Sequence, residues 1–364
     1  MNSIELYSFK YYITLSAFMF IFVYLRLCVS NDNTFFKNNS INSFLSFLLL
    51  FIIIAFIGFR DPEPDVAGGY DTKTYTSMYR EIANIDFSES EGKDIGFFFL
   101  MKLSNTFGFS IIFFYLMCAF LYIVPVYMAF KKWFSKNAFY ALAMYITAMS
   151  FWSFGINGVR NGLAVSLFIY SLRFIDKKWI AYIIMAVSVL FHKSMLLPII
   201  FFLFFFVEFS TKKIISIWFV SVIICLIFGT VIGDSITSLL EIIDTRAQYM
   251  YDVQPEFLNN SFRFDFIIYS SLPILLGYYY IYKKKYSDRF YIQLLNTYIL
   301  TNAVWILFFM YVPFSNRYAY LSWCIMPIII IYPLLKERIL KKQYKYIGLI
   351  ILGNLLFTIL MFLK

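Results

Sequence analysis

An all-α protein that crosses a membrane many times is the fold predicted by this sequence. Of its 364 residues, 61% are hydrophobic and only 14% are charged. The mean hydropathy is +0.73, which excludes an ordinary soluble domain. Crossing about 30 Å of hydrocarbon takes roughly 20 apolar residues. About twelve apolar runs approach that length, at 11–29, 41–59, 109–130, 137–154, 158–175, 179–191, 194–209, 214–232, 264–282, 290–312, 318–335 and 346–363.

Two of these runs, 179–191 and 194–209, are short for a full crossing. A bilayer accepts tilted, half-inserted or broken helices when protein or a water-filled cavity satisfies the freed backbone groups. Residues 95–107 are also apolar, and we expect them to form an interfacial or re-entrant helix. The first run has no cleavage-site pattern, so we expect it to remain as the first span. The chain 1–364 is then a single integral membrane domain.

The lysines predict the orientation of the spans. The formal net charge of +10 comes largely from lysines in short loops, at 131–136, 177–178, 212–213, 283–285 and 336–345. This is the positive-inside pattern, which places these loops in the cytoplasm and argues against a nucleic-acid partner. The two larger loops, 60–94 and 233–263, then lie outside, as do both termini.

Motifs of soluble enzymes are absent from the sequence. It contains no Gly-rich phosphate loop, no His-Glu-x-x-His and no serine nucleophile elbow. The cysteines lie inside apolar runs without metal-ligand spacing, at Cys28, Cys118, Cys225 and Cys324. We therefore expect no disulfide framework, no metal and no cofactor.

The outer loop 60–94 is the most acidic part of the chain. Asp61, Asp65 and Asp71 could each act as a general base or bind a hard cation, or simply complement the positive-inside bias. Asp71 has a further structural interpretation as the N-cap of a short helix from Thr72 to Ile82. The loop 233–263 mixes charged and aromatic residues, which suits an extended sugar but also any interfacial loop.

Four arginines lie at ends of apolar runs on the predicted outer face: Arg60, Arg160, Arg263 and Arg317. The last three begin helices that run inward, each after an Asn or Ser able to cap the helix. A cation is unfavourable at a helix N-terminus, but a bound phosphate would make the arrangement favourable. Snorkelling to lipid headgroups is the alternative explanation. The spacing Gly158-x-x-x-Gly162 around Arg160 allows close ligand approach or helix packing.

His192, the only histidine, lies on the same predicted face. A histidine at a membrane interface often has a structural role. Its ordinary pKa of about 6.5 nevertheless suits it to accept a proton from a sugar hydroxyl near neutral pH. With the arginines, it indicates a transferase in which a sugar hydroxyl attacks an anomeric carbon. The arginines would stabilise the charge on a departing lipid diphosphate.

Short segments in the same order resemble the EpsG-like branch of the Wzy-type polysaccharide repeat-unit polymerases of bacteria. They are Gly58–Arg60 with Gly69–Thr72 and Tyr75, then Arg160–Ala164, Phe191–Leu196 and Asn316–Tyr318. The resemblance implies a GT-C-like membrane glycosyltransferase in the cytoplasmic (inner) membrane. Such an enzyme joins undecaprenyl-diphosphate-linked oligosaccharides of O-antigen, capsule or exopolysaccharide at the periplasmic or outer face.

The resemblance also implies roles for individual residues. Arg60, Arg160 and Arg317 would contact the diphosphate, while His192 and Asp71 would position or activate the acceptor. Arg263 has no counterpart in the family pattern and depends on topology alone. The chain has Asn161 where the family pattern has Gln, and Lys193 where a small residue is usual. The expected partners are the lipid-linked oligosaccharide and membrane lipids, and the family would also allow a chain-length regulator protein.

Two other functions remain open at this stage. A flippase for the same lipid needs cations deep within its spans, whereas these spans are nearly free of charge at mid-depth. An O-antigen ligase uses the same chemistry, and only the family motifs favour a polymerase over it. The sequence does not decide the sugars, the linkage or which of His192 and Asp71 is the base.

Overall fold

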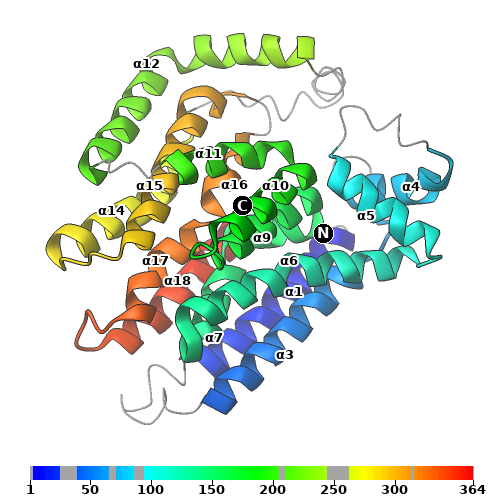
Figure 1. Ribbon diagram of the computed structural model, residues 1–364, viewed down its shortest axis with the longest axis horizontal. Coiled ribbons are helices and arrows are strands. Elements are labelled where there is room, and N and C mark those ends of the chain that lie inside the picture. The colour runs from blue at the N-terminus through cyan, green and yellow to red at the C-terminus, as the bar shows by residue number, and fades with distance from the viewer. Residues whose placement is uncertain are drawn as a thin grey trace. The chain divides into compact units, whose positions relative to one another are not determined.

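The computed structural model describes residues 3–24, 39–64, 71–85, 94–204, 210–243, 262–312 and 315–363. Every regular element within these ranges is a helix (Figure 1), which confirms the all-α class. The chain forms two compact units. Unit 1 comprises Met1–Met195 and Leu334–Lys364, and unit 2 comprises Leu196–Pro333.

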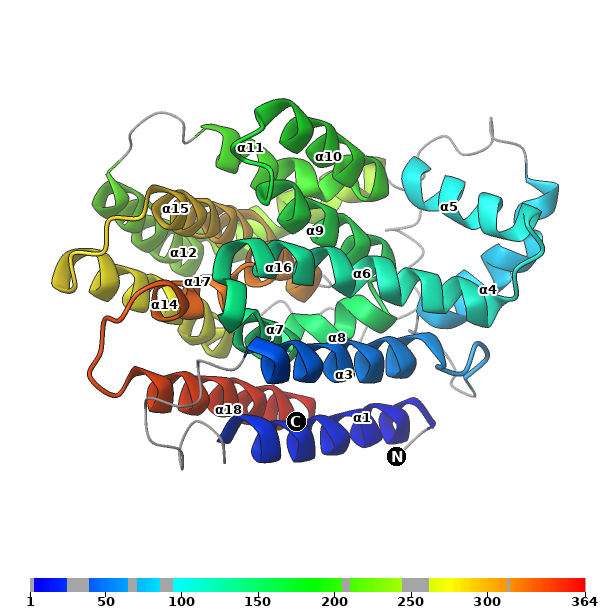
Figure 2. The same ribbon diagram turned by 60° about the horizontal axis from the view of Figure 1, so that its bottom comes forward.

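Unit 1 contains both ends of the chain. In Figure 2, the helices α1, α3 and α18 run side by side within it, and the Tyr7 hydroxyl on α1 donates to the Phe56 carbonyl on α3 at 2.6 Å. Its helices are α1 (Ser3–Met19), η1 (Phe20–Tyr24), α3 (Asn39–Gly58), α4 (Asp71–Glu81), η2 (Ile82–Asn84), α5 (Ile95–Thr106), α6 (Ile111–Phe134), η4 (Ser135–Asn137), α7 (Ala138–Ile146), α8 (Met149–Ile156), α9 (Val159–Leu172), α10 (Lys178–Phe191), η5 (Lys193–Met195) and α18 (Gln343–Phe362).

Unit 2 contains α11 (Leu196–Phe204), α12 (Thr211–Ile243), α14 (Phe264–Tyr278), η7 (Tyr279–Lys283), α15 (Arg289–Val304), η8 (Trp305–Phe309) and α16 (Ser315–Trp323). The helix α17 (Met326–Lys336) leads from unit 2 back into unit 1.

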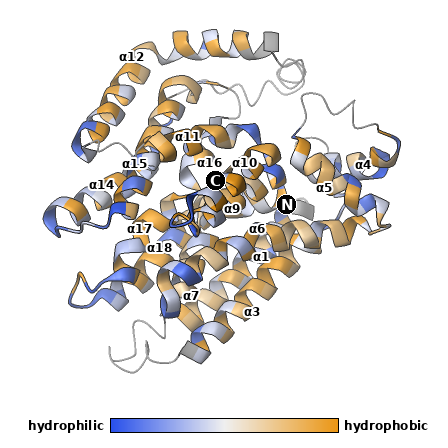
Figure 3. Ribbon diagram, viewed as in Figure 1, coloured by the Kyte–Doolittle hydropathy of each residue, from blue (hydrophilic) through white to orange (hydrophobic). Residues whose placement is uncertain are grey.

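Within the residues that the structure describes, eight helices are long and apolar enough to cross a membrane, so this is a multi-pass membrane protein. They are Glu5–Val23, Ser40–Gly58, Ile111–Ile146, Thr211–Leu239, Phe264–Lys283, Arg289–Phe309, Ser315–Lys336 and Gln343–Phe362, and three shorter apolar helices are Val159–Leu172, Lys178–Phe191 and Lys193–Phe204. In Figure 3, α3 and α6 are hydrophobic along most of their length, while the loop after α17 carries hydrophilic residues. The expected helix near 95–107 is present as α5, and its depth in a membrane remains a prediction.

The predicted span 137–154 is instead two short helices, α7 and α8, broken after Thr147. Side chains satisfy the backbone groups freed at this break. The Thr147 hydroxyl bonds the carbonyls of Ala143 and Met144, each at 3.0 Å. From α18, the Asn354 amide donates to the Thr147 hydroxyl at 3.0 Å, and the Thr358 hydroxyl donates to the Thr147 carbonyl at 2.8 Å. A buried break is tolerated because protein supplies these partners.

A buried polar network joins four helices of unit 2. The Trp218 indole on α12 donates to Asn302 Oδ1 on α15 at 2.7 Å. The Asn302 amide donates to the hydroxyls of Ser270 on α14 and Ser322 on α16, at 3.1 and 2.9 Å. The Trp323 indole also donates to the Ser270 hydroxyl, at 2.8 Å. Because each buried group has a partner, the network fixes the register of these helices without an unpaired polar group.

Candidate functional site

Three charged or titratable side chains meet in unit 1. Asp94 precedes α5, Arg160 lies in the first turn of α9, and His192 follows α10. Arg160 Nη1 lies 2.9 Å from Asp94 Oδ2, and His192 Nδ1 lies 3.8 Å from Asp94 Oδ1. The side chain of Asp94 is only 10% exposed, whereas Arg160 and His192 retain 34% and 27%. The carboxylate is therefore the inner member of the cluster, and the other two side chains reach the surface.

A glycine brings Asp94 to this position. A Cβ atom on Gly96 would lie 2.9 Å from Phe191 Cδ2 and 3.1 Å from the Leu190 carbonyl carbon and oxygen. The start of α5 therefore packs directly on the last turn of α10, because residue 96 has no side chain. Asp94 is the N-cap residue of α5 but makes no side-chain capping bond. Its carboxylate is used by Arg160 and His192 instead.

The turn that carries His192 is fixed to α9. The His192 N–H donates to the Ser188 carbonyl at 3.1 Å, which closes α10. The Ser188 hydroxyl donates to the Ala164 carbonyl on α9 at 2.7 Å. The Ser194 hydroxyl lies 3.4 Å from His192 Nδ1 and donates to Asn161 Oδ1 at 3.3 Å. Asp94 and Ser194 thus both approach Nδ1, and Nε2 is the ring nitrogen on the opposite edge.

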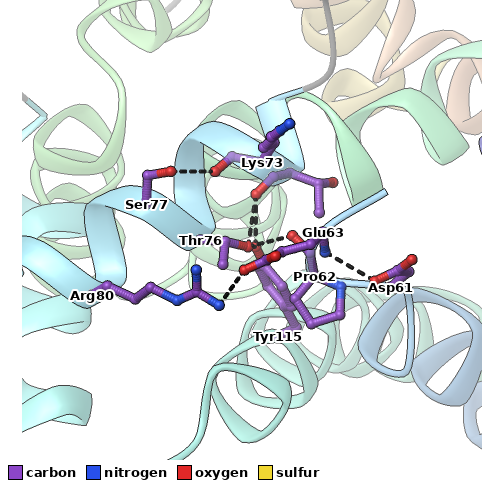
Figure 4. A network of polar contacts seen from close by, with 9 residues as sticks. Asp61, Pro62, Glu63, Lys73, Thr76, Ser77, Arg80 and Tyr115 are labelled. Carbon is purple, nitrogen blue, oxygen red and sulfur yellow. Dashed lines mark hydrogen bonds and ion pairs between the residues drawn. The ribbon is translucent and has the colours of Figure 1, made fainter. Parts of the chain in front are cut away.

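The described residues 60–64 and 71–85 pack on α6 through the helix α4. Thr76 lies at the centre of the network in Figure 4, where its hydroxyl bonds the Pro62 carbonyl at 2.7 Å and the Tyr115 hydroxyl at 2.8 Å. The Tyr115 hydroxyl donates to the Thr72 carbonyl at 2.9 Å. On the exposed side of α4, Arg80 forms an ion pair with Glu63 (Figure 4). The predicted helix at 72–82 is confirmed, with Asp71 as its first residue.

The start of α4 lies near Arg160. The Tyr75 hydroxyl donates to the Asn157 carbonyl at 3.2 Å, directly before α9. Tyr75, Asp94 and Asp71 all interact electrostatically with Arg160. The structure therefore brings together three of the residues selected from the sequence, Arg160, His192 and Asp71. It adds Asp94, which no sequence pattern distinguishes from the other acidic residues of its loop.

Arg60 has a different environment. Its side chain is buried, Nη1 donates to the carbonyls of Ile57 at 2.9 Å and Gly155 at 3.2 Å, and Cζ lies 3.8 Å from the centre of the Tyr115 ring. Burial lowers the pKa of Arg60 below its ordinary value, although a guanidinium keeps its proton in proteins. In this structure Arg60 joins the end of α3 to α8.

The other two predicted arginines belong to unit 2. Arg263 directly precedes α14 and forms a two-bond pair with Asp265, at 2.9 Å from Nε and 2.7 Å from Nη2. Its Cζ also lies 3.8 Å from the centre of the Phe266 ring. Arg317 is an exposed residue in the first turn of α16.

The predicted capping of these helices is wrong at two of them. The N-cap of α9 is Gly158 and that of α14 is Arg263 itself, and neither makes a side-chain capping bond. We expected a bound phosphate to supply negative charge beside these arginines. In the structure, Asp94 supplies it beside Arg160 and Asp265 supplies it beside Arg263. The helix-packing interpretation of the glycine pair is supported, because a Cβ on Gly162 would lie 2.7 Å from the Phe154 carbonyl oxygen.

Some predicted features fall outside the described residues, namely Asp65, Cys28 and residues 244–261 of the second loop. Within the described ranges, the free cysteines Cys118, Cys225 and Cys324 are buried. In the same ranges, no group of three or more His, Cys, Asp or Glu residues could hold a metal ion. The described site therefore consists of a carboxylate, a guanidinium and an imidazole, with Asp71 and Tyr75 beside them.

The cluster lies in a region that matches a known protein family. A sequence model described as the EpsG family matches residues 43–364, which is most of the chain and includes every residue of the cluster. No curated protein and no solved structure matches.

Proposed function

The chain belongs to the EpsG family, a family of Wzy-like polymerases, and on this basis we propose that it is a membrane glycosyltransferase that polymerises lipid-linked oligosaccharides. Its substrate would be an oligosaccharide repeat unit on undecaprenyl diphosphate, used at the outer face of the cytoplasmic membrane. The observation that carries this proposal is the cluster of Arg160, Asp94 and His192, which combines an anion-binding group with a titratable base.

The reaction requires one bond to form and one to break. A hydroxyl of the acceptor sugar attacks the anomeric carbon of the donor, and the bond from that carbon to the diphosphate oxygen breaks. The hydroxyl proton passes to a base, for which His192 is our first candidate and Asp71 the second. Undecaprenyl diphosphate leaves with the bonding electrons, and its negative charge needs a cation.

Arg160 is suited to that charge. A guanidinium can donate two parallel bonds to a phosphate, and about a third of the Arg160 side chain is exposed. Its place in the first turn of α9 adds the N–H groups of a helix N-terminus. Arg317 occupies the equivalent position on α16, and we propose it, together with Arg60 and Arg263, as a further diphosphate contact.

The test uses purified protein in lipid vesicles or detergent with its undecaprenyl-diphosphate-linked repeat unit. The wild type should produce a ladder of longer glycans. Arg160→Ala should lower kcat/KM by about 10²–10³-fold, the usual cost of removing one group that stabilises a developing anion. Arg317→Ala should lower kcat/KM by a similar factor, so neither variant should produce ladders of wild-type length.

Arg80→Ala is the matched control, because Arg80 is an exposed arginine of the same unit whose partner is Glu63. Ladders of wild-type length from both Arg160→Ala and Arg317→Ala would refute the diphosphate role. Movement of the lipid-linked unit across vesicles without glycan growth would indicate a flippase instead.

A further inference from the structure

Asp94 faces two groups that both favour a negative charge. Its Oδ2 is within hydrogen-bond distance of Arg160, at 2.9 Å. Its Oδ1 lies 3.8 Å from His192 Nδ1, which is about 0.6 Å beyond a normal hydrogen bond. The carboxylate is thus fully engaged with the arginine and only close to the histidine.

Burial makes the choice of partner important. Asp94 is 10% exposed, and a carboxylate at such a position needs a hydrogen-bonding or charged partner at all times. A diphosphate that binds Arg160 would compete with Asp94 for the same N–H groups and repel its charge. An alternative donor is the Nδ1 edge of His192, which lies 3.8 Å from Oδ1.

We propose that Asp94 is an exchangeable counter-ion, paired with Arg160 when the site is empty and with His192 when a lipid diphosphate occupies Arg160. This inference rests on the proposed function only in taking a lipid diphosphate as the ligand. Asp94 is then a positioning residue, which acts on the reaction through its two neighbours.

The exchange makes donor binding control which ring nitrogen of His192 carries the proton. With Asp94 on Nδ1, the imidazole carries its proton on Nδ1 and presents the Nε2 lone pair to the acceptor hydroxyl. As the proton of that hydroxyl moves to Nε2, the sugar oxygen bonds to the anomeric carbon, and the bond from that carbon to the diphosphate oxygen breaks so that the diphosphate departs. Asp94 stabilises the resulting imidazolium, whereas before donor binding its charge is committed to Arg160.

Because His192 is the only histidine of the chain, nitrogen NMR of histidine-labelled protein reports on it alone. The first experiment adds undecaprenyl diphosphate to the wild type at constant pH. The Nδ1 resonance should move towards that of a protonated, hydrogen-bonded nitrogen. Unchanged imidazole resonances at saturating undecaprenyl diphosphate would overturn the exchange, and this test needs no substitution that could impair folding.

The second experiment uses Asp94→Asn, which keeps the shape and an acceptor oxygen but removes the charge. Undecaprenyl diphosphate should bind about 3- to 5-fold more tightly, roughly the effect of one partly exposed ion pair, because Arg160 no longer has an internal competitor. The kcat should fall about 10- to 100-fold, part of the usual contribution of a general base. Weaker binding together with lower kcat would show a structural role and overturn the proposal, as would an unchanged kcat.

Asp176→Asn is the matched control. Asp176 is an exposed carboxylate of the same unit, and its charged partner Lys132 lies 4.0 Å away and is also exposed. Binding and kcat should remain at wild-type values. If the wild type binds the diphosphate and shows the NMR change but makes no glycan ladder, the polymerase proposal fails and the exchange stands. A glycan ladder without the NMR change would support the polymerase proposal and overturn the exchange.

Discussion

Replacing Gly96 with alanine should displace α5 and so impair the site that Asp94 forms with Arg160. Ordinary contacts between carbon atoms are about 3.5–4.0 Å, whereas the new Cβ would lie 2.9 Å from Phe191 Cδ2 and 3.1 Å from the Leu190 carbonyl. The phenylalanine ring can turn, but the backbone carbonyl cannot, so α5 must move by about 0.3–0.5 Å to restore contact. Overpacking of this kind costs about 1–3 kcal/mol.

The displacement falls two residues from Asp94, whose bond to Arg160 is 2.9 Å long. A misplacement of about 1 Å can cost 10²-fold in rate, so we expect Gly96→Ala to lower kcat about 10-fold and to reduce the melting temperature in detergent. Activity comes from the ladder assay and stability from thermal unfolding. Gly353→Ala is the control, because the new Cβ has nothing within 4 Å and alanine favours the helix by about 0.5–1 kcal/mol. Wild-type rate and melting temperature in Gly96→Ala would refute the role assigned to this close approach.

Three further outcomes are expected. His192→Ala should lower kcat about 10²–10⁴-fold with little change in the melting temperature, and full activity would mean that Asp71 or no protein group is the base. Asn302→Ala should destabilise unit 2 by about 2–3 kcal/mol, because the buried Trp218 indole and two serine hydroxyls lose their partner; an unchanged thermal unfolding curve would contradict this. Arg80→Ala should cost less than about 1 kcal/mol, since its ion pair with Glu63 is exposed on both sides, and a large loss of stability would show that this pair holds α4 in place.

Hydrophobicity alone predicted the class of the fold. Eight of the predicted runs correspond to helices long and apolar enough to span, because length and apolar content are properties of a single segment. The break after Thr147 was not predicted from the same pattern. Its run is continuously apolar, and the groups that satisfy the break come from α18, about 200 residues later.

Only part of the site was predicted, because some of its residues are distinguished only by contacts with distant segments. Arg160 and His192 were identifiable because each is an unusual residue type in its segment. Asp94 was one acidic residue among many in an acidic loop. Its partners lie on α9 and after α10, so only the packing of α5 on α10 distinguishes it. The pairing of Arg263 with Asp265 could have been predicted from the sequence, since the two are separated by one residue.

The break between α7 and α8 also bears on how the protein is made. Unit 1 takes its first 195 residues before unit 2 and the rest after it, so α18 is synthesised after every residue of unit 2. Until α18 inserts, the Thr147 carbonyl lacks the Thr358 hydroxyl that bonds it in the finished protein. During synthesis unit 1 therefore stays unfinished while unit 2 is made, and α18 completes a core begun some 200 residues earlier.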